Sequence, residues 1–481
     1  MEVGTKKKKS LFAEIDMTSG NLFWKIVLFA LPLGFTTVLQ LLYTSVDLIT
    51  VSQGDSPDSM AAIGATNVIV NLIVVVFQAM ALGSNVCLAQ AKGAGDHEKA
   101  QKVLHTSLWM ALISGVVVGL IGYFVAPYLL EAIGTEEAYL EKSSQYLEIY
   151  FLGLPALMLF NYCAQMLRAE GDAKAPFIAL TVAGLTNVAF DCLFVFAFKM
   201  SVAGVAYATI MAQALSAIIV IIVLFKSKSS YVNIHLKELK IDKETMFDII
   251  RIGLPAGLQR FFFSLPNIFV QSALYTIDPG NTDLTNGAIA AGNIEGYVYA
   301  MIEGLTLSCL SFTAQNLGAK KGNNIKKVFI YAEIWGLIYC ALAALVIGLF
   351  NEPLLYLLVD SPESVASGRE RLFIMIFPYA MNSIFQISAG SMRGQRHSTF
   401  PMITVLLCST IVRIVYIYAL FYQFDFFHNL TWLYFVYPLS WTLNSICNLS
   451  GLAYFMPRTL RKIEEENRLS PAERPISESE N

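Results

Sequence analysis

Long apolar runs separated by short polar segments are the feature that most constrains this chain. A run of about 20 apolar residues is long enough to cross the hydrocarbon core of a bilayer as a helix. With 56% hydrophobic and only 14% charged residues, the chain lies outside the range of soluble proteins, in which about a quarter of residues are charged. We therefore expect an all-α integral membrane protein with twelve transmembrane helices, at 26–52, 61–89, 103–126, 146–167, 175–198, 202–225, 247–274, 287–312, 328–350, 372–392, 401–422 and 432–455.

The two halves of the chain repeat one another. Residues 89–94 (AQAKGA) recur at 314–319 as AQNLGA, and Arg168 recurs as Arg393, so both pairs are 225 residues apart. Each half holds six predicted spans, an even number, so both halves enter the membrane from the same side. The sequence therefore predicts two six-helix bundles related by a pseudo-twofold axis along the membrane normal, an arrangement typical of transporters.

Basic residues predict the orientation. Lysine and arginine gather on alternate connections, while the intervening loops are mostly acidic. By the positive-inside rule, both termini are cytoplasmic, and we expect a multi-pass protein of a prokaryotic cytoplasmic (inner) membrane. The Glu/Ser/Pro-rich tail is expected to be disordered. The predicted organisation is a cytoplasmic tail at 1–25, an N-lobe at 26–225, a cytoplasmic linker at 226–246, a C-lobe at 247–457 and a second cytoplasmic tail at 458–481.

Motifs for catalysis are missing from the sequence. There is no phosphate-binding G-x-x-x-x-G-K and no G-x-S-x-G, which argues against an ATP-driven pump or a membrane hydrolase. His97-Glu98 begins a zinc-protease pattern, but Gln101 stands where the second histidine is needed. We therefore expect no enzyme, no cofactor, no structural metal and no nucleic-acid partner. The expected partners are the lipid bilayer and small-molecule substrates, and the expected state is a monomer.

Two acids in the N-lobe have no basic residue to neutralise them. An ionisable side chain at membrane depth costs about 3 kcal/mol on insertion scales, so it needs a partner or a function. Asp47 and Asp191 lie within predicted spans, and none of the six N-lobe spans contains lysine or arginine. Helix rise places both acids and Thr209 in the outer half of the lobe. The resulting candidate cation or proton site is Asp47, Asn187, Asp191 and Thr209, supported by Gln40 and Tyr43 on the helix face of Asp47.

The C-lobe carries charges of both signs within its spans. Arg260 and Arg413 can neutralise Glu295 and Glu303 internally. The rise per residue of a helix places Glu295, Arg260 and Arg413 at similar depths in the membrane, which suggests that Glu295 pairs with Arg260 or with Arg413. Whether these charges are structural or functional stays open. The candidate C-lobe polar cluster is Gln259, Arg260, Glu295 and Arg413.

In the order and spacing of its motifs, the sequence resembles the multidrug and toxic compound extrusion (MATE) family across essentially all twelve spans. The resemblance is closer to the DinF-like and archaeal branch than to the NorM-like branch. In the former, an acid in the first helix, an Asn/Asp pair in the fifth and a threonine in the sixth surround a cation site, and these positions correspond to Asp47, Asn187, Asp191 and Thr209. The NorM-like branch has acids in helices seven and ten, where this chain has Phe262-Phe263 and Asn382. The motifs that carry the resemblance are Leu31-Pro32, Gln40, residues 43–47 (YTSVD), 89–94, 187–191 and 204–209 (GVAYAT).

The resemblance implies secondary active efflux of organic, cationic or amphipathic compounds by antiport with H+ or Na+. Two neighbouring carboxylates suit either ion, because oxygen ligands bind a hard cation and a pair of acids retains a proton. A lipid or oligosaccharide-lipid flippase of related architecture is the alternative, and it should line its cleft with several basic residues. Arg260 and Arg413 are the only deep ones that the sequence offers. A passive channel is disfavoured by the unpaired acids and proline-bearing helices.

Overall fold

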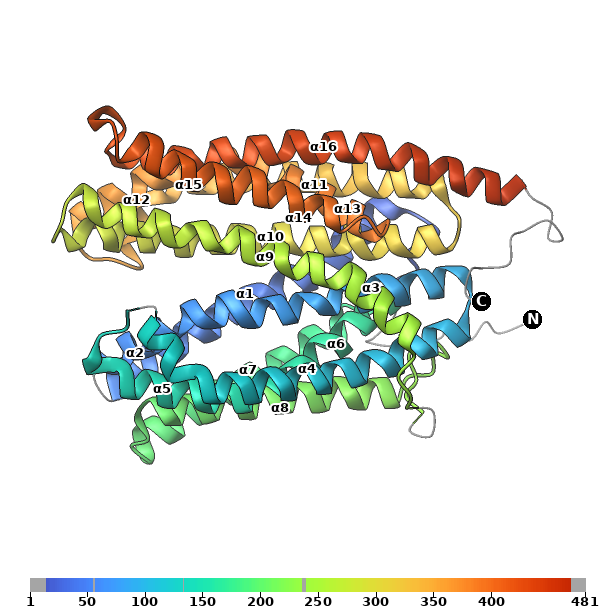
Figure 1. Ribbon diagram of the computed structural model, residues 1–481, viewed down its shortest axis with the longest axis horizontal. Coiled ribbons are helices and arrows are strands. Elements are labelled where there is room, and N and C mark those ends of the chain that lie inside the picture. Colours follow the sequence, from blue (N-terminus) through green and yellow to red (C-terminus); the bar gives the residue numbers. More distant parts are fainter. Residues whose placement is uncertain (1–13, 55–56, 133, 236–238, 469–481) are drawn as a thin grey trace, which may run out of the picture.

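The computed structural model describes residues 14–54, 57–132, 134–235 and 239–468 and has no β-strand among them (Figure 1). The first half consists of α1 (Leu22–Gly54), α2 (Pro57–Ile69), the π-helical η1 (Val70–Val74), α3 (Val75–Ala94), α4 (His97–Ala132), α5 (Glu137–Leu152), α6 (Leu154–Glu170), α7 (Lys174–Cys192), the π-helical η2 (Leu193–Ala197) and α8 (Ser201–Phe225). The second half consists of α9 (Lys243–Ile277), α10 (Thr282–Gly318), α11 (Gly322–Tyr356), α12 (Pro362–Met375), α13 (Pro378–Gly394), α14 (Thr399–Val405), η4 (Leu406–Ile411), α15 (Val412–Tyr416), η5 (Ile417–Phe421), η6 (Asp425–Phe427) and α16 (Leu430–Arg468).

Every predicted span coincides with a helix or with consecutive helices. Six of these are long and apolar enough to cross a membrane by length and composition: α1, α4, α7 with η2, α8, α11, and α14 through η5. Two bent pairs add to them, α5 with α6 at 49° and α12 with α13 at 53°. Both bends precede a proline in the first turn of the following helix, where proline is tolerated because its missing N–H would have no partner. The remaining predicted spans lie in α2 through α3, α9, α10 and α16.

One boundary differs from the prediction. α16 continues to Arg468, so residues 458–468 are helical and do not belong to a disordered tail. Residues 469–481 and most of the predicted tail at 1–25 lie outside the described residues, as does part of the predicted linker at 226–246.

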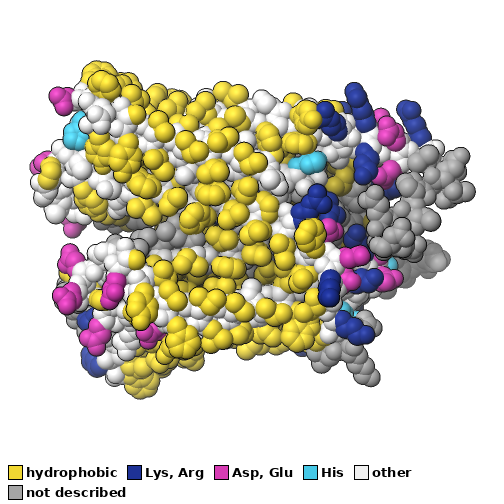
Figure 2. Space-filling view, viewed as in Figure 1, with side chains coloured by type: hydrophobic (Ala, Val, Ile, Leu, Met, Phe, Trp, Pro, Cys, Tyr) yellow, Lys and Arg dark blue, Asp and Glu magenta, His cyan; other side chains and the backbone are white. Residues whose placement is uncertain are grey.

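The helices form two bundles, α1–α8 and α9–α16, that lie side by side (Figure 1). Lysine and arginine side chains gather at one end of the molecule, the basic end, and acidic side chains are prominent at the other, the acidic end (Figure 2). The surface is hollowed between the bundles toward the acidic end (Figure 2). The bundles therefore meet mainly in the half of the molecule that includes the basic end.

Glycines allow the two bundles to meet closely. A Cβ atom at Gly93 of α3 would overlap the backbone oxygen of Gln315 on α10, and one at Gly318 of α10 would overlap that of Gln90 on α3. The repeated AQxxGA element thus packs against its own copy, which explains why both copies have glycine at the same position. α3 and α9 meet in the same way, because a Cβ at Gly83 would overlap the backbone of α9.

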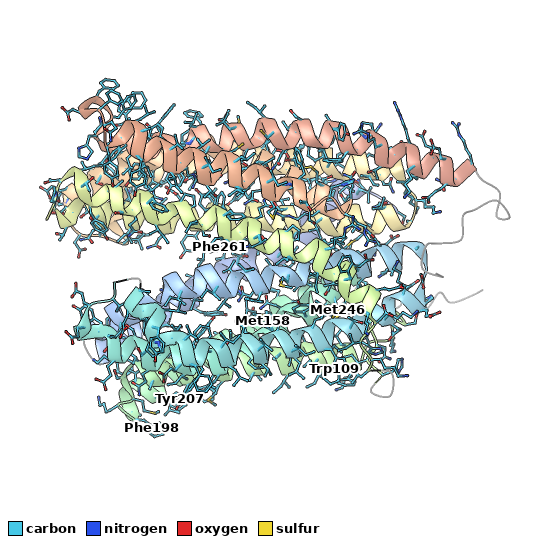
Figure 3. All side chains as sticks on the ribbon, viewed as in Figure 1. Trp109, Met158, Phe198, Tyr207, Met246 and Phe261 are labelled. Carbon is cyan, nitrogen blue, oxygen red and sulfur yellow. The ribbon has the colours of Figure 1, made fainter. Side chains whose placement is uncertain are left out.

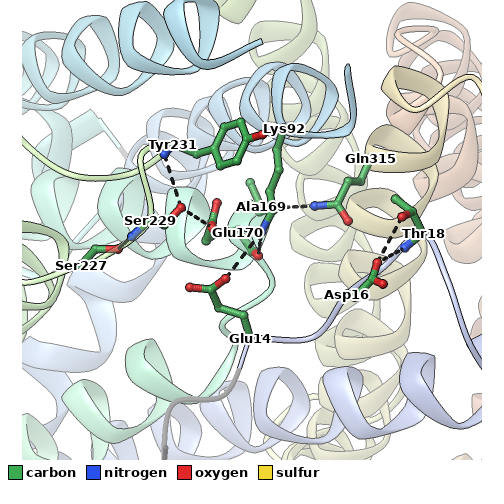
Figure 4. A network of polar contacts seen from close by, with 10 residues as sticks. All are labelled: Glu14, Asp16, Thr18, Lys92, Ala169, Glu170, Ser227, Ser229, Tyr231 and Gln315. Atoms are coloured by element: carbon green, nitrogen blue, oxygen red, sulfur yellow. Dashed lines mark hydrogen bonds and ion pairs between the residues drawn. The ribbon is translucent and has the colours of Figure 1, made fainter. Parts of the chain in front are cut away.

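Polar contacts reinforce this junction at the basic end (Figure 4). Lys92 of α3 pairs with Glu170 of α6 at 2.9 Å, and Glu170 accepts a hydrogen bond from Ser229 of the connection between the bundles at 2.6 Å. From the second bundle, Gln315 donates to the backbone oxygen of Ala169 at 3.4 Å. Side chains of both bundles and of the connection are therefore tied together at one place.

Large apolar side chains cover the outer faces. Trp109 of α4 and Tyr207 of α8 point away from the bundle (Figure 3) and are 37% and 40% exposed, and Phe198 is 60% exposed. In water such a surface would be costly, since each square ångström of exposed apolar area costs about 25 cal/mol. In a bilayer it faces lipid, as expected for a multi-pass membrane protein.

The glycine junction makes a prediction. Replacing Gly93 by alanine should force α3 and α10 apart and lower the stability of the protein by about 1–3 kcal/mol, the usual cost of overpacking. The thermal unfolding of the purified protein measures this loss. Gly348→Ala is the matched control, because no described atom beyond its own stretch of helix lies within 4 Å of a Cβ at that position. Equal unfolding temperatures for Gly93→Ala and Gly348→Ala would contradict the close crossing.

Candidate functional site

Two buried acids face one another between α1 and α7. Asp47 is 8% exposed and Asp191 is 0% exposed, and their carboxylates lie close enough to interact directly. Oδ1 of Asp47 and both carboxylate oxygens of Asp191 have no hydrogen-bond partner among the described residues. Because a buried charge without a partner is strongly unfavourable, this pair requires a proton or a cation.

Asn187 and Thr209, which were predicted to lie beside the two acids, are found next to them in the structure. Asn187 lies one turn before Asp191 on α7 and is 5% exposed, and its Nδ2 has no partner among the described residues. The Thr209 hydroxyl lies beside the Asp47 carboxylate. That hydroxyl donates to the backbone oxygen of Val205 at 2.9 Å, so its lone pairs remain available to a cation. The structure thus brings together the four residues predicted to bind the coupling ion.

A cavity of about 230 Å³ adjoins this pair in the first bundle. Gln40, Tyr43, Asp47, Asn187 and Thr209 all line it, and no lysine or arginine is among its described lining residues. Tyr43 is fixed in place by Gly184 of α7, where a Cβ atom would overlap the tyrosine ring. Asp191 lies behind the lining, against Asp47. A carboxyl pair beside a polar cavity can take up an ion from the cavity and hold it out of water.

Comparison with known proteins identifies the family. A family profile described as MatE matches residues 32–193 and again residues 255–419. The chain belongs to the MATE family. Among curated relatives, "Probable multidrug resistance protein YoeA" of Bacillus subtilis (strain 168) is 27% identical over 383 residues, covering 78% of this chain and 82% of that protein. "Multidrug export protein MepA" of Staphylococcus aureus (strain MSSA476) is 24% identical over 322 residues, covering 66% of this chain and 70% of that protein.

Solved MATE structures share the fold. One described as the outward-facing conformation of a multidrug resistance MATE family transporter of the MOP superfamily superposes with a TM-score of 0.86 at 21% sequence identity. The superposition covers 95% of this chain and 100% of that one. The predicted fold class, twelve transmembrane helices in two six-helix bundles, is confirmed.

The candidate cluster in the second bundle is not a single cluster. Glu295 does not pair with Arg260 or Arg413, because its partner is Arg371 of α12, which contacts both carboxylate oxygens at 2.8 and 2.9 Å. The sequence-based span at 372–392 left Arg371 in an outer loop. In the structure, α12 begins at Pro362 and packs on α10, which places Arg371 inside the bundle.

The other members of the predicted cluster have separate partners. Arg260 pairs with Glu303, and Gln259 accepts a hydrogen bond from Arg393 at 2.7 Å. Arg413 is fully buried. It donates to Ser440 at 2.9 Å and to Asn267 at 3.1 Å, and its guanidinium carbon lies 4.5 Å from the centre of the Tyr437 ring.

Two further residues of the bundles were not among the predicted site residues. Tyr146 of α5 lies near Asp47, Asp191 and Thr209 and lines the same cavity as Asp47. Glu333 of α11 has both carboxylate oxygens buried without a partner among the described residues. Its position five residues inside the predicted span at 328–350 was a usable signal, since any acid at that depth needs explanation.

The Glu295–Arg371 pair predicts a stability effect. Glu295→Gln should leave Arg371 buried without a counter-charge and lower stability by about 3–5 kcal/mol, whereas Glu295→Gln with Arg371→Met should recover much of that loss. Thermal unfolding of the single and double variants measures both changes. The exposed pair Arg369–Glu352, at 2.7 Å, is the control, and Glu352→Gln should cost less than about 1 kcal/mol. If Glu295→Gln unfolds like the wild-type protein and yet abolishes transport, the pair is functional and the structural interpretation is wrong.

Proposed function

We propose that this chain is a secondary active transporter that exports organic, cationic or amphipathic compounds by antiport with H+ or Na+. One observation carries the proposal: Asp47 and Asp191 are buried together with no basic partner among the described residues. The names of the relatives, which include a multidrug export protein and a probable multidrug resistance protein, support the outward direction of transport and the type of substrate.

The acid pair couples ion binding to the shape of the first bundle. Without an ion, the two carboxylates repel each other and favour separation of α1 from α7. A bound proton or Na+ removes this repulsion and favours closer packing. An ion can shift a conformational equilibrium only if it binds one state more tightly, and here the state with adjacent carboxylates is the one that binds it. Pro32 of α1 and the π-helical segment after Asp191 are the places where these helices can bend.

We assign the chain to the DinF-like and archaeal branch. Support comes from the convergence of Asp47, Asn187, Asp191 and Thr209 in the first bundle. The positions of the NorM-like acids in helices seven and ten hold Phe262-Phe263 and Asn382. Ion coupling is therefore assigned to the first bundle alone.

We further propose the arrangement of the chain in the cell. An N-lobe at 26–225 and a C-lobe at 247–457 act as the two moving halves of a monomer. The gathering of lysine and arginine at the basic end (Figure 2) supports placing both termini in the cytoplasm, with the protein in a prokaryotic cytoplasmic membrane. A flippase gains no support from the relatives named above, which are multidrug resistance and multidrug export proteins.

Asp191→Asn tests the function directly. This change removes the charge and keeps the size of the side chain, so the protein should fold while coupled transport falls at least about a hundredfold, because the ion loses its ligand. The measurement is efflux of a cationic dye from proteoliposomes under an imposed H+ or Na+ gradient. Asp47→Asn should behave in the same way, and the double variant should add little, since residues that act as one unit are not additive.

The control is Asp425→Asn, which removes the same charge from an exposed position outside the bundles and should transport normally. Gradient-driven efflux that persists in Asp191→Asn would overturn the assignment of the site. Efflux from wild-type protein that ignores both gradients would overturn antiport itself.

A further inference from the structure

A second cavity lies between the bundles. It has a volume of about 160 Å³ and is lined by residues of α1, α3 and α6 from the first bundle and of α9 and α10 from the second. Its charged lining residues are Arg168, Arg260 and Glu303. The predicted spans at 146–167 and 175–198 leave Arg168 in the connection between them, but in the structure it is only 9% exposed.

Positive charge predominates around this cavity. Arg260 and Glu303 form an ion pair, which leaves Glu303 as the shared counter-charge of two further arginines. Arg168 and its repeat equivalent Arg393 both lie within electrostatic range of Glu303. Arg393 is 6% exposed. Three guanidinium groups therefore share one carboxylate, an excess of positive charge that is costly at membrane depth.

Arg168 differs from the other two arginines in having no partner. Arg260 is paired with Glu303, and Arg393 donates to Gln259 at 2.7 Å. The Arg168 side chain makes no hydrogen bond or ion pair with any residue that the structure describes, and its Nε is buried without an acceptor. A guanidinium group has five N–H donors, so Arg168 presents unused donors to the cavity that it lines.

A purely structural role of Arg168 does not explain why its guanidinium group is buried without a hydrogen-bond partner. Arg168 lies in the last turn of α6, where the helix dipole favours a positive charge. The last carbonyl groups of a helix can also accept from an arginine side chain, but Nε of Arg168 donates to none of them among the described residues. Positions on the outside of the protein at the same end of the helix would give the same benefit without the cost of burial.

We propose that this cavity binds an anionic group of the transported molecule, a carboxylate or a phosphate, with Arg168 as its direct ligand and Arg260 beside it. Arginine suits this role, because its planar fork forms two parallel hydrogen bonds with a carboxylate or phosphate. The anion neutralises the excess charge that the protein leaves uncompensated. The preferred substrate thus carries a negative group in addition to its cationic or apolar part.

The anion site adjoins the cation site. Gln40, Gln78 and Phe160 line both cavities, so a molecule held at Arg168 lies next to the cavity that contains Asp47. The inference extends the proposed transport function to a substrate class, and equilibrium binding tests it without any ion gradient. A failure of binding selectivity is thereby distinguished from a failure of antiport.

The experiment compares two ligands that differ in one group. A xanthene dye with a free carboxylate and the methyl ester of the same dye are titrated onto the purified full-length protein, and binding is followed by fluorescence anisotropy. The wild-type protein should bind the acid about tenfold more tightly than the ester. Arg168→Gln removes no hydrogen bond or ion pair that the described residues make with this side chain, so it should fold, and it should lose this preference. Arg168→Lys, which keeps the charge, should retain part of it.

Arg251→Gln is the matched control. It removes an exposed arginine from the same helix as Arg260 and should leave the preference intact. The proposal is wrong if Arg168→Gln keeps the wild-type preference, or if the wild-type protein does not distinguish acid from ester. It is also wrong if the wild-type protein binds neither dye and inorganic phosphate leaves its unfolding temperature unchanged.

A lipid headgroup is the other source of the same chemistry. The titration is therefore repeated in nanodiscs of zwitterionic phosphatidylcholine and in nanodiscs that contain anionic phosphatidylglycerol. An unchanged preference for the acid supports a site for the transported molecule. Loss of the preference only with phosphatidylglycerol would assign the site to lipid and overturn the proposal.

Discussion

Charge at membrane depth must be neutralised, and the way in which each buried charge meets this requirement organises the molecule. In the second bundle, Glu295 and Arg371 neutralise each other. In the first bundle, Asp47 and Asp191 have, among the residues that the structure describes, only each other and neutral polar neighbours. A buried pair that is already neutral, such as Glu295–Arg371, needs no ion, whereas two adjacent acids need a counter-charge from solution. The two halves share a fold but have different electrostatic requirements.

The packing between the two bundles also differs from one end of the molecule to the other. Backbone crossings at Gly93 and Gly318, together with the polar contacts of Lys92, hold the halves together at the basic end. Toward the acidic end the surface is hollowed between them (Figure 2). Because Gln40 of α1 lines both the acid cavity and the arginine cavity, a bend of α1 changes both at once. A single helix therefore links the cavity beside the two acids to the space between the bundles.

Much of this could be predicted from the sequence, since it depends on local patterns. Helix length, the repeat and the unpaired acids are all readable from residue spacing, and Asp47, Asn187, Asp191 and Thr209 do converge. The partner of Glu295 was not readable, because it depends on where α12 begins and how it packs on α10. Arg168 was assigned to a loop because it lies near the end of its span, although its long side chain lies buried against the cavity. Pairing across helices needs three-dimensional placement that one sequence does not provide.

The distance between the outer ends of α1 and α7 is the most direct test of the coupling mechanism. Nitroxide labels at Ile49 and Phe198, which are 54% and 60% exposed, report this distance in a background that replaces Cys192 and Cys447, the two cysteines that are not buried. Acidic pH or added Na+ should shorten the distance in the wild-type protein, because a bound ion removes the repulsion between Asp47 and Asp191. A variant with asparagine at both positions should show the short distance under every condition. A distance that is the same with and without either ion in the wild-type protein would contradict the account.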